Sequence, residues 1–129
     1  MAEAVRKRIL VVDDASLVRL FYRKELERAG FHVDEALNGL EALEKLMTAP
    51  ADLLIVDINM PQMDGLTFLD ALRNQELPLA STPAVVISTE SGSQDFAAAR
   101  KAGANYYLVK PVSSDSLVEV ARMLCGVAP

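Results

Sequence analysis

Short runs of apolar residues recur along the chain and predict its strands. The strongest runs occupy Arg8–Val12, Leu53–Val56 and Ala84–Ile87. Each is continuous rather than alternating with polar residues, which is typical of a parallel strand buried on both faces. Weaker runs at Phe31–Ala36 and Asn105–Val109 predict two further strands.

Between these strands, apolar residues recur at helical spacing. A fourth, less apolar helical segment runs from Ser93 to about Gly103, and Ser113 and Ser114 suit the cap of a fifth. Gly30 and Gly103 stand where a helix ends and the chain turns into the next strand. The periodic positions are Val18, Phe21, Tyr22, Leu26 and Ala29, then Leu40, Leu43, Leu46 and Met47, then Leu66, Leu69 and Leu72, and finally Leu117, Val120, Ala121 and Leu124.

Strict alternation of strand and helix predicts an α/β fold of the (βα)5 kind. Crossovers between parallel strands are right-handed, which places helices on both faces of a doubly wound, five-stranded parallel sheet. Ligands of such sheets bind at the carboxyl ends of the strands. The residues that follow each strand are therefore the first place to look for chemistry.

Composition limits the function classes that remain. The 129 residues are 51% hydrophobic, enough for one domain, which we expect to span 1–129 with a core of about 7–126. A net charge of -5 argues against nucleic acids and acidic membrane surfaces as partners. One cysteine excludes an internal disulfide or a thiolate metal cluster. Without a signal-peptide pattern or a membrane-spanning apolar run, we expect a cytoplasmic protein, monomeric or weakly dimeric.

Polar residues stand just past the strong strands. Asp13 and Asp14 follow the first, Asp57 the third, Ser88 the fourth and Lys110 the fifth. A single Asp in such a place often only caps a helix or forms a turn. Turn formation explains neither a lysine nor three carboxylates that converge on one edge of a sheet. The set therefore predicts a reactive site.

The three carboxylates favour a bound Mg²⁺ ion. Gathered at one edge, they repel and raise one another's pKa unless a cation lies among them. Mg²⁺ prefers oxygen ligands and is often held by one or two carboxylates and a phosphate oxygen. Three carboxylates, one divalent cation and Lys110 together carry no net charge. We expect Asp13 and Asp14 to hold the ion.

This arrangement suits phosphoryl transfer, in which a protein mainly positions groups and neutralises charge. Asp57 is the expected in-line nucleophile, which would form an acyl phosphate. Lys110 supplies a mobile positive charge for one phosphoryl oxygen, and the Ser88 hydroxyl donates to another.

At these residues the chain resembles the receiver domains of two-component response regulators, of the single-domain, CheY-like type. The segments that carry the resemblance are 11–16 (VVDDAS), 56–65 (VDINMPQMDG) and 109–111 (VKP), and it covers essentially the whole chain. It implies a flavodoxin-like sheet with strand order 2-1-3-4-5. It also implies phosphorylation of Asp57 by a histidine kinase or phosphotransfer protein, with the backbone carbonyl of Asn59 as a further Mg²⁺ ligand.

The resemblance further implies a conformational switch. The Ser88 hydroxyl moves toward the phosphoryl group, Tyr107 turns inward, and a protein target reads the changed face made by helix 4, strand 5 and helix 5. A cis bond between Lys110 and Pro111 is implied to aim the lysine.

Side chains near the acceptor are implied to set how long the phosphate survives. Asn59, Thr89 and Glu90 occupy the positions that tune this lifetime. Thr89 departs from the family, which usually has a smaller residue there. Pro61 and Gly65 are implied to shape the loop that leads into the third helix.

Rival functions are disfavoured by particular positions. A phosphohydrolase with an aspartate nucleophile, the closest alternative, should carry a second acid where this chain has Asn59. A flavin or nucleotide binder needs a glycine- or hydroxyl-rich loop where residues 12–16 offer acids. A degenerate receiver would have lost one of the active-site residues. We therefore expect a phosphoacceptor regulator rather than an enzyme.

The chain ends at Pro129, soon after the last helix, so we expect output by contact with a protein partner. Residues 91–95 (SGSQD) lack the lysines that chemotaxis regulators often place there, which weakens a flagellar motor as the target and favours a phosphorelay. His32 is expected to be a strand-edge residue and Cys125 a packing residue.

Overall fold

A computed structural model describes residues 6–60 and 62–127. Pro61, expected to shape a loop, lies outside the described residues. The strands and helices alternate along the chain as the sequence predicts. In order they are β1 (Arg8–Val12), α1 (Ser16–Arg28), β2 (His32–Ala36), α2 (Gly39–Thr48), β3 (Leu53–Asp57), α3 (Gly65–Arg73), the 3-10 turn η1 (Leu79–Ser81), β4 (Ala84–Ser88), α4 (Ser93–Ala102), β5 (Tyr106–Val109) and α5 (Ser114–Cys125).

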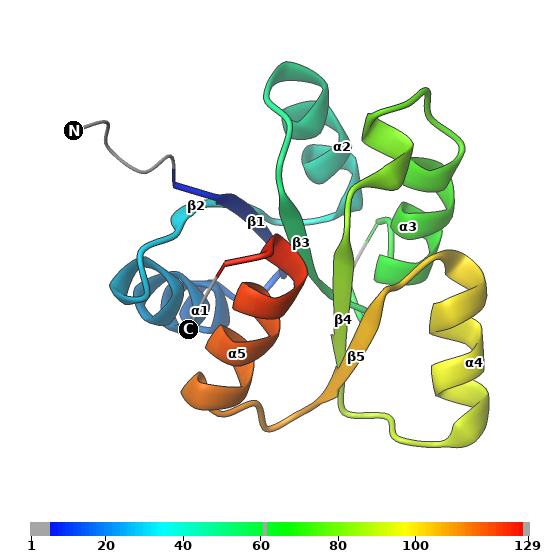
Figure 1. Ribbon diagram of the computed structural model, residues 1–129. Helices are drawn as coiled ribbons and strands as arrows, with labels where there is room; N and C mark the ends of the chain where they lie inside the picture. Colours follow the sequence, from blue (N-terminus) through cyan, green and yellow to red (C-terminus); the bar gives the residue numbers. More distant parts are fainter. Residues whose placement is uncertain (1–5, 61, 128–129) are drawn as a thin grey trace.

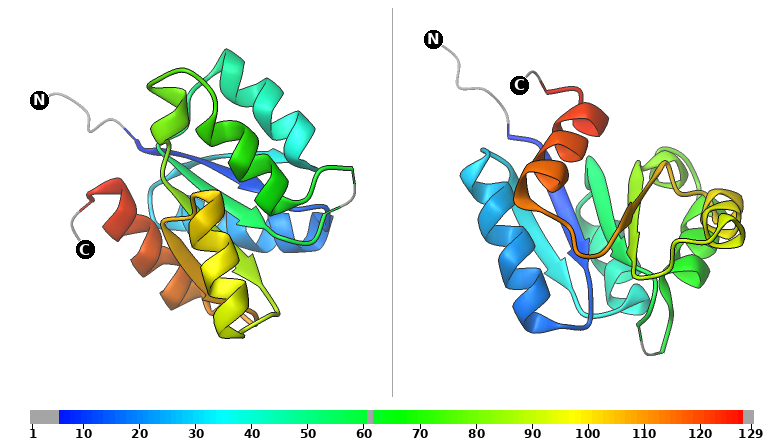
Figure 2. Two further views of the ribbon diagram at one scale, coloured as in Figure 1. Left: turned by 90° about the vertical axis from the view of Figure 1, so that its right-hand side faces the viewer. Right: turned by 90° about the horizontal axis from the view of Figure 1, so that it is seen from below.

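The five strands form one parallel sheet in the order β2-β1-β3-β4-β5, which confirms the predicted order (Figure 1). Helices α1 and α5 cover one face, and α2, α3 and α4 cover the other (Figure 2). Successive strand residues point to opposite faces, so alternate residues of β1 enter different cores, with Ile9 and Val11 on the α1 and α5 side and Leu10 and Val12 on the other. This two-sided burial is why the strands read as continuous apolar runs.

Two strands are one residue longer than the sequence predicts. Asp57 is the last residue of β3 and Ser88 the last of β4, rather than the first residues after them. The ladder includes both, because Asp57 is in register with Ile87 and Ser88 with Val109. Sheet pairing therefore fixes the backbone of Asp57 and of Ser88.

The buried face of α2 also differs from the expected one. Leu40 and Met47 are 50% and 66% exposed, whereas Gly39, Ala42 and Leu46 are buried. Gly39 is in close contact with α3, since an added Cβ would lie 2.8 Å from Cβ of Phe68. Small residues thus form much of the inward face, and a search for large apolar residues overlooks them.

The ends of the helices follow the predicted signals. Gly30 and Gly103 have φ angles of 101° and 108°, a left-handed conformation that glycine adopts without strain. The Ser113 side chain caps α5 by accepting a hydrogen bond from the Ser116 amide. Within residues 6–60 and 62–127, every helix is too short or too polar to cross a lipid bilayer.

Candidate functional site

Three carboxylates meet at the carboxyl edge of the sheet. Oxygen atoms of Asp13, Asp14 and Asp57 all lie within 4.8 Å of one another. They meet because β1 and β3 are neighbours and Val12 is in register with Val56, which brings the next residue of each strand to the same edge. Asp13 and Asp57 are only 2% and 6% exposed, whereas Asp14 is open to solvent. The acidic cluster that the sequence predicts is therefore present.

Burial makes this cluster electrostatically unfavourable on its own. It raises the pKa of the Asp13 carboxyl, which the hydrogen bond from the Ala15 amide partly opposes. Burial also raises the pKa of Asp57, and the charge of Asp13 raises it further, while Lys110 opposes both effects. A cation among the carboxylates would relieve this cost.

The two carboxylate oxygens of Asp13 differ in their hydrogen bonding. Its Oδ1 accepts a hydrogen bond of 2.9 Å from the Ala15 amide. Its Oδ2 is buried and has no hydrogen-bond partner among the described residues. Because an unpaired buried carboxylate oxygen is costly, it suits a hard divalent cation, and the all-oxygen cluster fits Mg²⁺.

Lys110 brings a positive charge close to Asp57. Its Nζ lies 3.5 Å from Oδ1 of Asp57, and its amide donates a 2.8 Å hydrogen bond to the Ser88 carbonyl. The Lys110–Pro111 peptide bond is cis, as is Leu77–Pro78, for which the sequence gives no signal.

Ser88 and Tyr107 are joined through the loop after β4. Ser88 is fully buried, and its Oγ accepts a 3.0 Å hydrogen bond from the Glu90 amide. The Tyr107 hydroxyl donates a 2.7 Å hydrogen bond to the Glu90 carbonyl, and its ring packs edge-on against Phe96 with centroids 4.6 Å apart. Thr89 is exposed between Ser88 and Glu90. Ser88 and Tyr107 therefore both bond the backbone of Glu90.

The loop after β3 passes very close to α3. Asn59 is exposed on this loop, and its backbone amide lowers the pKa of Asp57 as a smaller effect than burial. The Gly65 amide donates a 2.9 Å hydrogen bond to the Ile58 carbonyl. A Cβ on Gly65 would lie 2.5 Å from the Asp57 carbonyl oxygen. Gly65 thus allows α3 to approach the backbone of Asp57 closely, in addition to the turn role expected for it.

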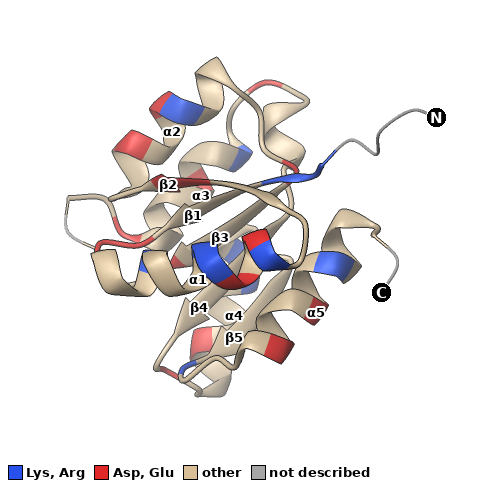
Figure 3. Ribbon diagram, turned by 90° about the vertical axis from the view of Figure 1, so that its left-hand side faces the viewer, with Lys and Arg blue, Asp and Glu red and all other residues tan. Residues whose placement is uncertain are grey.

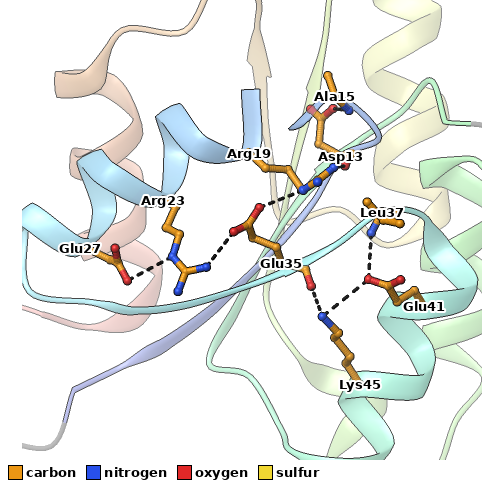
Figure 4. Close-up of polar contacts among 9 residues, drawn as sticks. All are labelled: Asp13, Ala15, Arg19, Arg23, Glu27, Glu35, Leu37, Glu41 and Lys45. Carbon is orange, nitrogen blue, oxygen red and sulfur yellow. Dashed lines mark hydrogen bonds and ion pairs between the residues drawn. The ribbon is translucent and has the colours of Figure 1, made fainter. Parts of the chain in front are cut away.

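Sequence reasoning overlooked an ionic network behind the acidic loop (Figure 4). Arg19 donates to the Asp13 carbonyl at 2.7 Å and to Oε1 of Glu35 at 2.9 Å. Glu35 also accepts from Arg23 at 2.7 Å. The Arg23 hydrogen bond is the main cause of a lowered Glu35 pKa. Charged residues at helical spacing were a weak signal, because most such residues simply face solvent.

Other residues that the sequence brings to notice lie outside the site. His32 is exposed on β2, an edge strand. Cys125 is the last residue of α5 and is buried in the core, and burial raises the pKa of its thiol to about 11. Both places agree with the expected strand-edge and packing roles.

Comparison with known proteins places this site in a family context. Residues 9–122 match the family described as the response regulator receiver domain. The chain is 39% identical over 121 residues to the chemotaxis protein CheY1 of Helicobacter pylori, covering 92% of this chain and 97% of that protein. It is 42% identical over 107 residues to a protein-glutamate methylesterase/protein-glutamine glutaminase of Archaeoglobus fulgidus, covering 81% of this chain but only 30% of that protein. The solved structure of Vibrio cholerae chemotaxis protein CheY4 matches with a TM-score of 0.87 at 32% identity, covering 93% of this chain and 99% of that one.

Replacing Gly65 by alanine should distort the loop after β3. The added methyl would overlap the Asp57 carbonyl, and we expect the free energy of unfolding to fall by about 1–3 kcal/mol. Urea unfolding measures this loss. Thr67→Ala, at an exposed position of the same helix, should change it by less than about 0.5 kcal/mol. Equal effects of the two substitutions would contradict the close approach.

Glu35→Gln should destabilise the protein in a pH-dependent way. The Glu35 pKa is lowered in the folded protein, so its stabilising effect is present above its ordinary value of 4.5 and is lost as the pH falls through the lowered value. At pH 7 we expect a loss of about 1 kcal/mol in unfolding free energy, vanishing in acid. A pH series of denaturant titrations tests this, with the more exposed Glu27→Gln as control; a loss that persists in acid would refute the ionic explanation.

Proposed function

Because this chain belongs to the family of response regulator receiver domains and so acts as a phosphorylation-dependent switch, we propose that Asp57 accepts the phosphoryl group. One observation carries the assignment. Asp57 is the buried carboxylate that pairs with Lys110, whose Nζ lies at 3.5 Å, and oxygens of Asp13 and Asp14 lie within 4.8 Å of it. The neighbouring acids suit metal binding, and the lysine suits charge neutralisation.

In the proposed reaction, a carboxylate oxygen of Asp57 attacks the phosphorus in line. The bond from phosphorus to the donor's nitrogen or oxygen breaks, and its electron pair leaves with the donor. Asp57 must be ionised to attack, which Lys110 favours by lowering the pKa that burial raises. Lys110 is also close enough to pair with an oxygen of the transferred group, and the Ser88 hydroxyl is placed at the end of the neighbouring strand.

We assign the Mg²⁺ site to Asp13, Asp14, Asp57 and the backbone carbonyl of Asn59. The unpartnered Oδ2 of Asp13 supports this assignment. When bound, Mg²⁺ would supply positive charge to the carboxylates and to the oxygens of the phosphoryl group. The chain's own part is to hold the ligands together before the ion arrives.

The proposed switch runs from Ser88 through Glu90 to Tyr107. If the Ser88 hydroxyl turns to donate to a phosphoryl oxygen, its contact with the Glu90 amide changes, and Glu90 is the residue whose carbonyl holds Tyr107. The changed surface is then the face of α4, β5 and α5. Asn59, Thr89 and Glu90 are exposed around the acceptor, where their side chains can regulate water and so the lifetime of the phosphate.

The proposed donor is a histidine kinase or a phosphotransfer protein, and the target is a protein that contacts α4, β5 and α5. A groove of about 310 Å³ on this face supports the target assignment; its lining residues include Phe96, Arg100, Tyr106 and Tyr107. We assign residues 1–129 to one receiver domain with a core of about 7–126, since all its strands belong to one sheet. The buried free thiol of Cys125 suits the reducing cytoplasm.

We also propose that the protein is a regulator and not an enzyme with an external substrate. The phosphohydrolase alternative needs an acid two residues after the nucleophile. Asn59 stands there, and its amide cannot protonate a leaving group.

Phosphorylation by a small donor tests the acceptor assignment. Wild-type protein incubated with acetyl phosphate and Mg²⁺ should gain the mass of one phosphoryl group, whereas Asp57→Asn should gain none because it lacks the nucleophile. Intact-mass spectrometry measures the gain, and Asp70→Asn on the exposed side of α3 serves as control. If Asp57→Asn took up phosphate as wild type does, the nucleophile would lie elsewhere.

Loss of the lysine should separate phosphorylation from switching. We expect Lys110→Ala to accept phosphate about 100-fold more slowly, because the charge on the phosphoryl oxygens is no longer paired. Once phosphorylated, it should show smaller amide shifts at Tyr107 than wild type in NMR spectra. Lys24→Ala on the exposed side of α1 is the control. Full-sized shifts at Tyr107 in Lys110→Ala would exclude the lysine from the switch.

A further inference from the structure

We infer that Arg19 is a positioning residue for the metal site. Mg²⁺ affinity then depends on the hydrogen bond from Arg19 to the backbone carbonyl between Asp13 and Asp14. The inference rests on the proposed metal site and extends it to a residue that is not a ligand. Arg19 lies in the second turn of α1, behind the acidic loop (Figure 4). Its guanidinium bonds the backbone carbonyl of Asp13 and the carboxylate of Glu35.

The Arg19 guanidinium makes two bonds in different directions. NH1 donates to the Asp13 carbonyl at 2.7 Å, and Nε donates to Oε1 of Glu35 at 2.9 Å. The side chain is only 12% exposed, so these bonds are largely shielded from water. A planar fork with several fixed donors can hold a carbonyl and a carboxylate at once, which a lysine ammonium on a flexible stem does poorly.

The carbonyl that Arg19 holds belongs to the peptide unit linking Asp13 to Asp14. A peptide unit is planar, so fixing its oxygen fixes the orientation of the Asp14 amide as well. The Asp13 amide is held from the other side by the Ala36 carbonyl at 3.1 Å, and Oδ1 of Asp13 by the Ala15 amide. Only Oδ2 of Asp13 has no partner among the described residues. One bond from Arg19 therefore helps aim two of the three carboxylates.

Glu35, which holds Arg19, is itself fixed by several hydrogen bonds. Its second oxygen accepts from Arg23 at 2.7 Å, and Arg23 also bonds Glu27 at 3.3 Å. Its backbone carbonyl accepts a hydrogen bond from Lys45 on α2. Figure 3 shows basic and acidic segments together along α1 beside β2, where this network lies. Glu35 is thus held from α1 and α2 while it holds Arg19.

Arg19 could affect the metal site by orienting the backbone of Asp13 or by its positive charge. The positive charge of Arg19 is paired with Glu35 through an ion pair of 2.9 Å, and Arg19 contacts Asp13 at its backbone carbonyl. Loss of a partner that orients a metal ligand typically weakens metal binding about 10- to 100-fold. We expect the effect of Arg19 to come from orientation, so a residue with the same charge should restore it only in part.

The experiment is a Mg²⁺ titration without phosphodonor, followed by the amide shifts of Asp13, Asp14 and Asp57. We expect Arg19→Ala to bind Mg²⁺ about 10-fold more weakly than wild type, and Arg19→Lys to lie between the two. Arg23→Ala is the matched control. It removes one ion pair of Glu35 but leaves the contacts of Glu35 with Arg19 and Lys45 in place, and Arg23 itself does not bond Asp13. Its affinity should therefore stay within about twofold of wild type.

A second measurement uses metal-free protein. Hydrogen exchange of the Ala15 amide, which bonds Oδ1 of Asp13, should be faster in Arg19→Ala than in wild type or Arg23→Ala. Wild-type affinity in Arg19→Ala, or full affinity in Arg19→Lys, would overturn the positioning role, and the lysine variant decides the matter if the alanine variant does not fold. Equal weakening by Arg23→Ala would also overturn it, because the effect would then be general destabilisation. Failure of wild type to bind Mg²⁺ would instead overturn the proposed metal site and the inference with it.

Discussion

Mutual repulsion among buried carboxylates is the constraint on which the rest of this structure depends. Asp13 and Asp57 are withdrawn from water, and Asp14 stands beside them, so each ionised group disfavours the others. The fold tolerates this arrangement because its strands are held by two cores and because the positive charge of Lys110 lies 3.5 Å from Asp57. The repulsion that remains among the carboxylates increases the affinity of this edge for positive charge. It explains why the same edge suits both a divalent cation and a group rich in negative oxygens that arrives with one.

Much of the fold could be read from the sequence because its signals are local. Continuous runs such as Leu53–Val56 are long enough and apolar enough to be strands, and turns such as the one at Gly30 require the conformations that glycine allows. The acidic cluster was also predictable, since parallel strands bring the residues at their carboxyl ends to one edge. The position of the acidic cluster follows from the order of the strands alone.

What the sequence did not reveal depends on contacts between distant segments. Gly65 resembles an ordinary turn glycine until its distance from the Asp57 carbonyl is known. Arg19 and Glu35 are 16 positions apart, and nothing in either residue shows that they meet behind Asp13. The inward face of α2 was misread because Gly39 and Ala42, which are small, pack where large residues were sought. In each case the deciding quantity is the space left by a neighbour, which no local pattern encodes.

The position of β5 at the margin of the sheet has a mechanical consequence. β3, which ends in Asp57, pairs with β1 and β4, whereas β5 pairs with β4 alone. Elements with fewer contacts open at lower free energy than those in the middle of a structure. A rearrangement around Tyr107 can therefore strain the pairing of β5 with β4 while the two strand pairings that hold Asp57 stay closed. The sheet would then be stiff around the proposed acceptor and compliant at the face proposed for the partner, so that repeated signals need not loosen the site where each one starts.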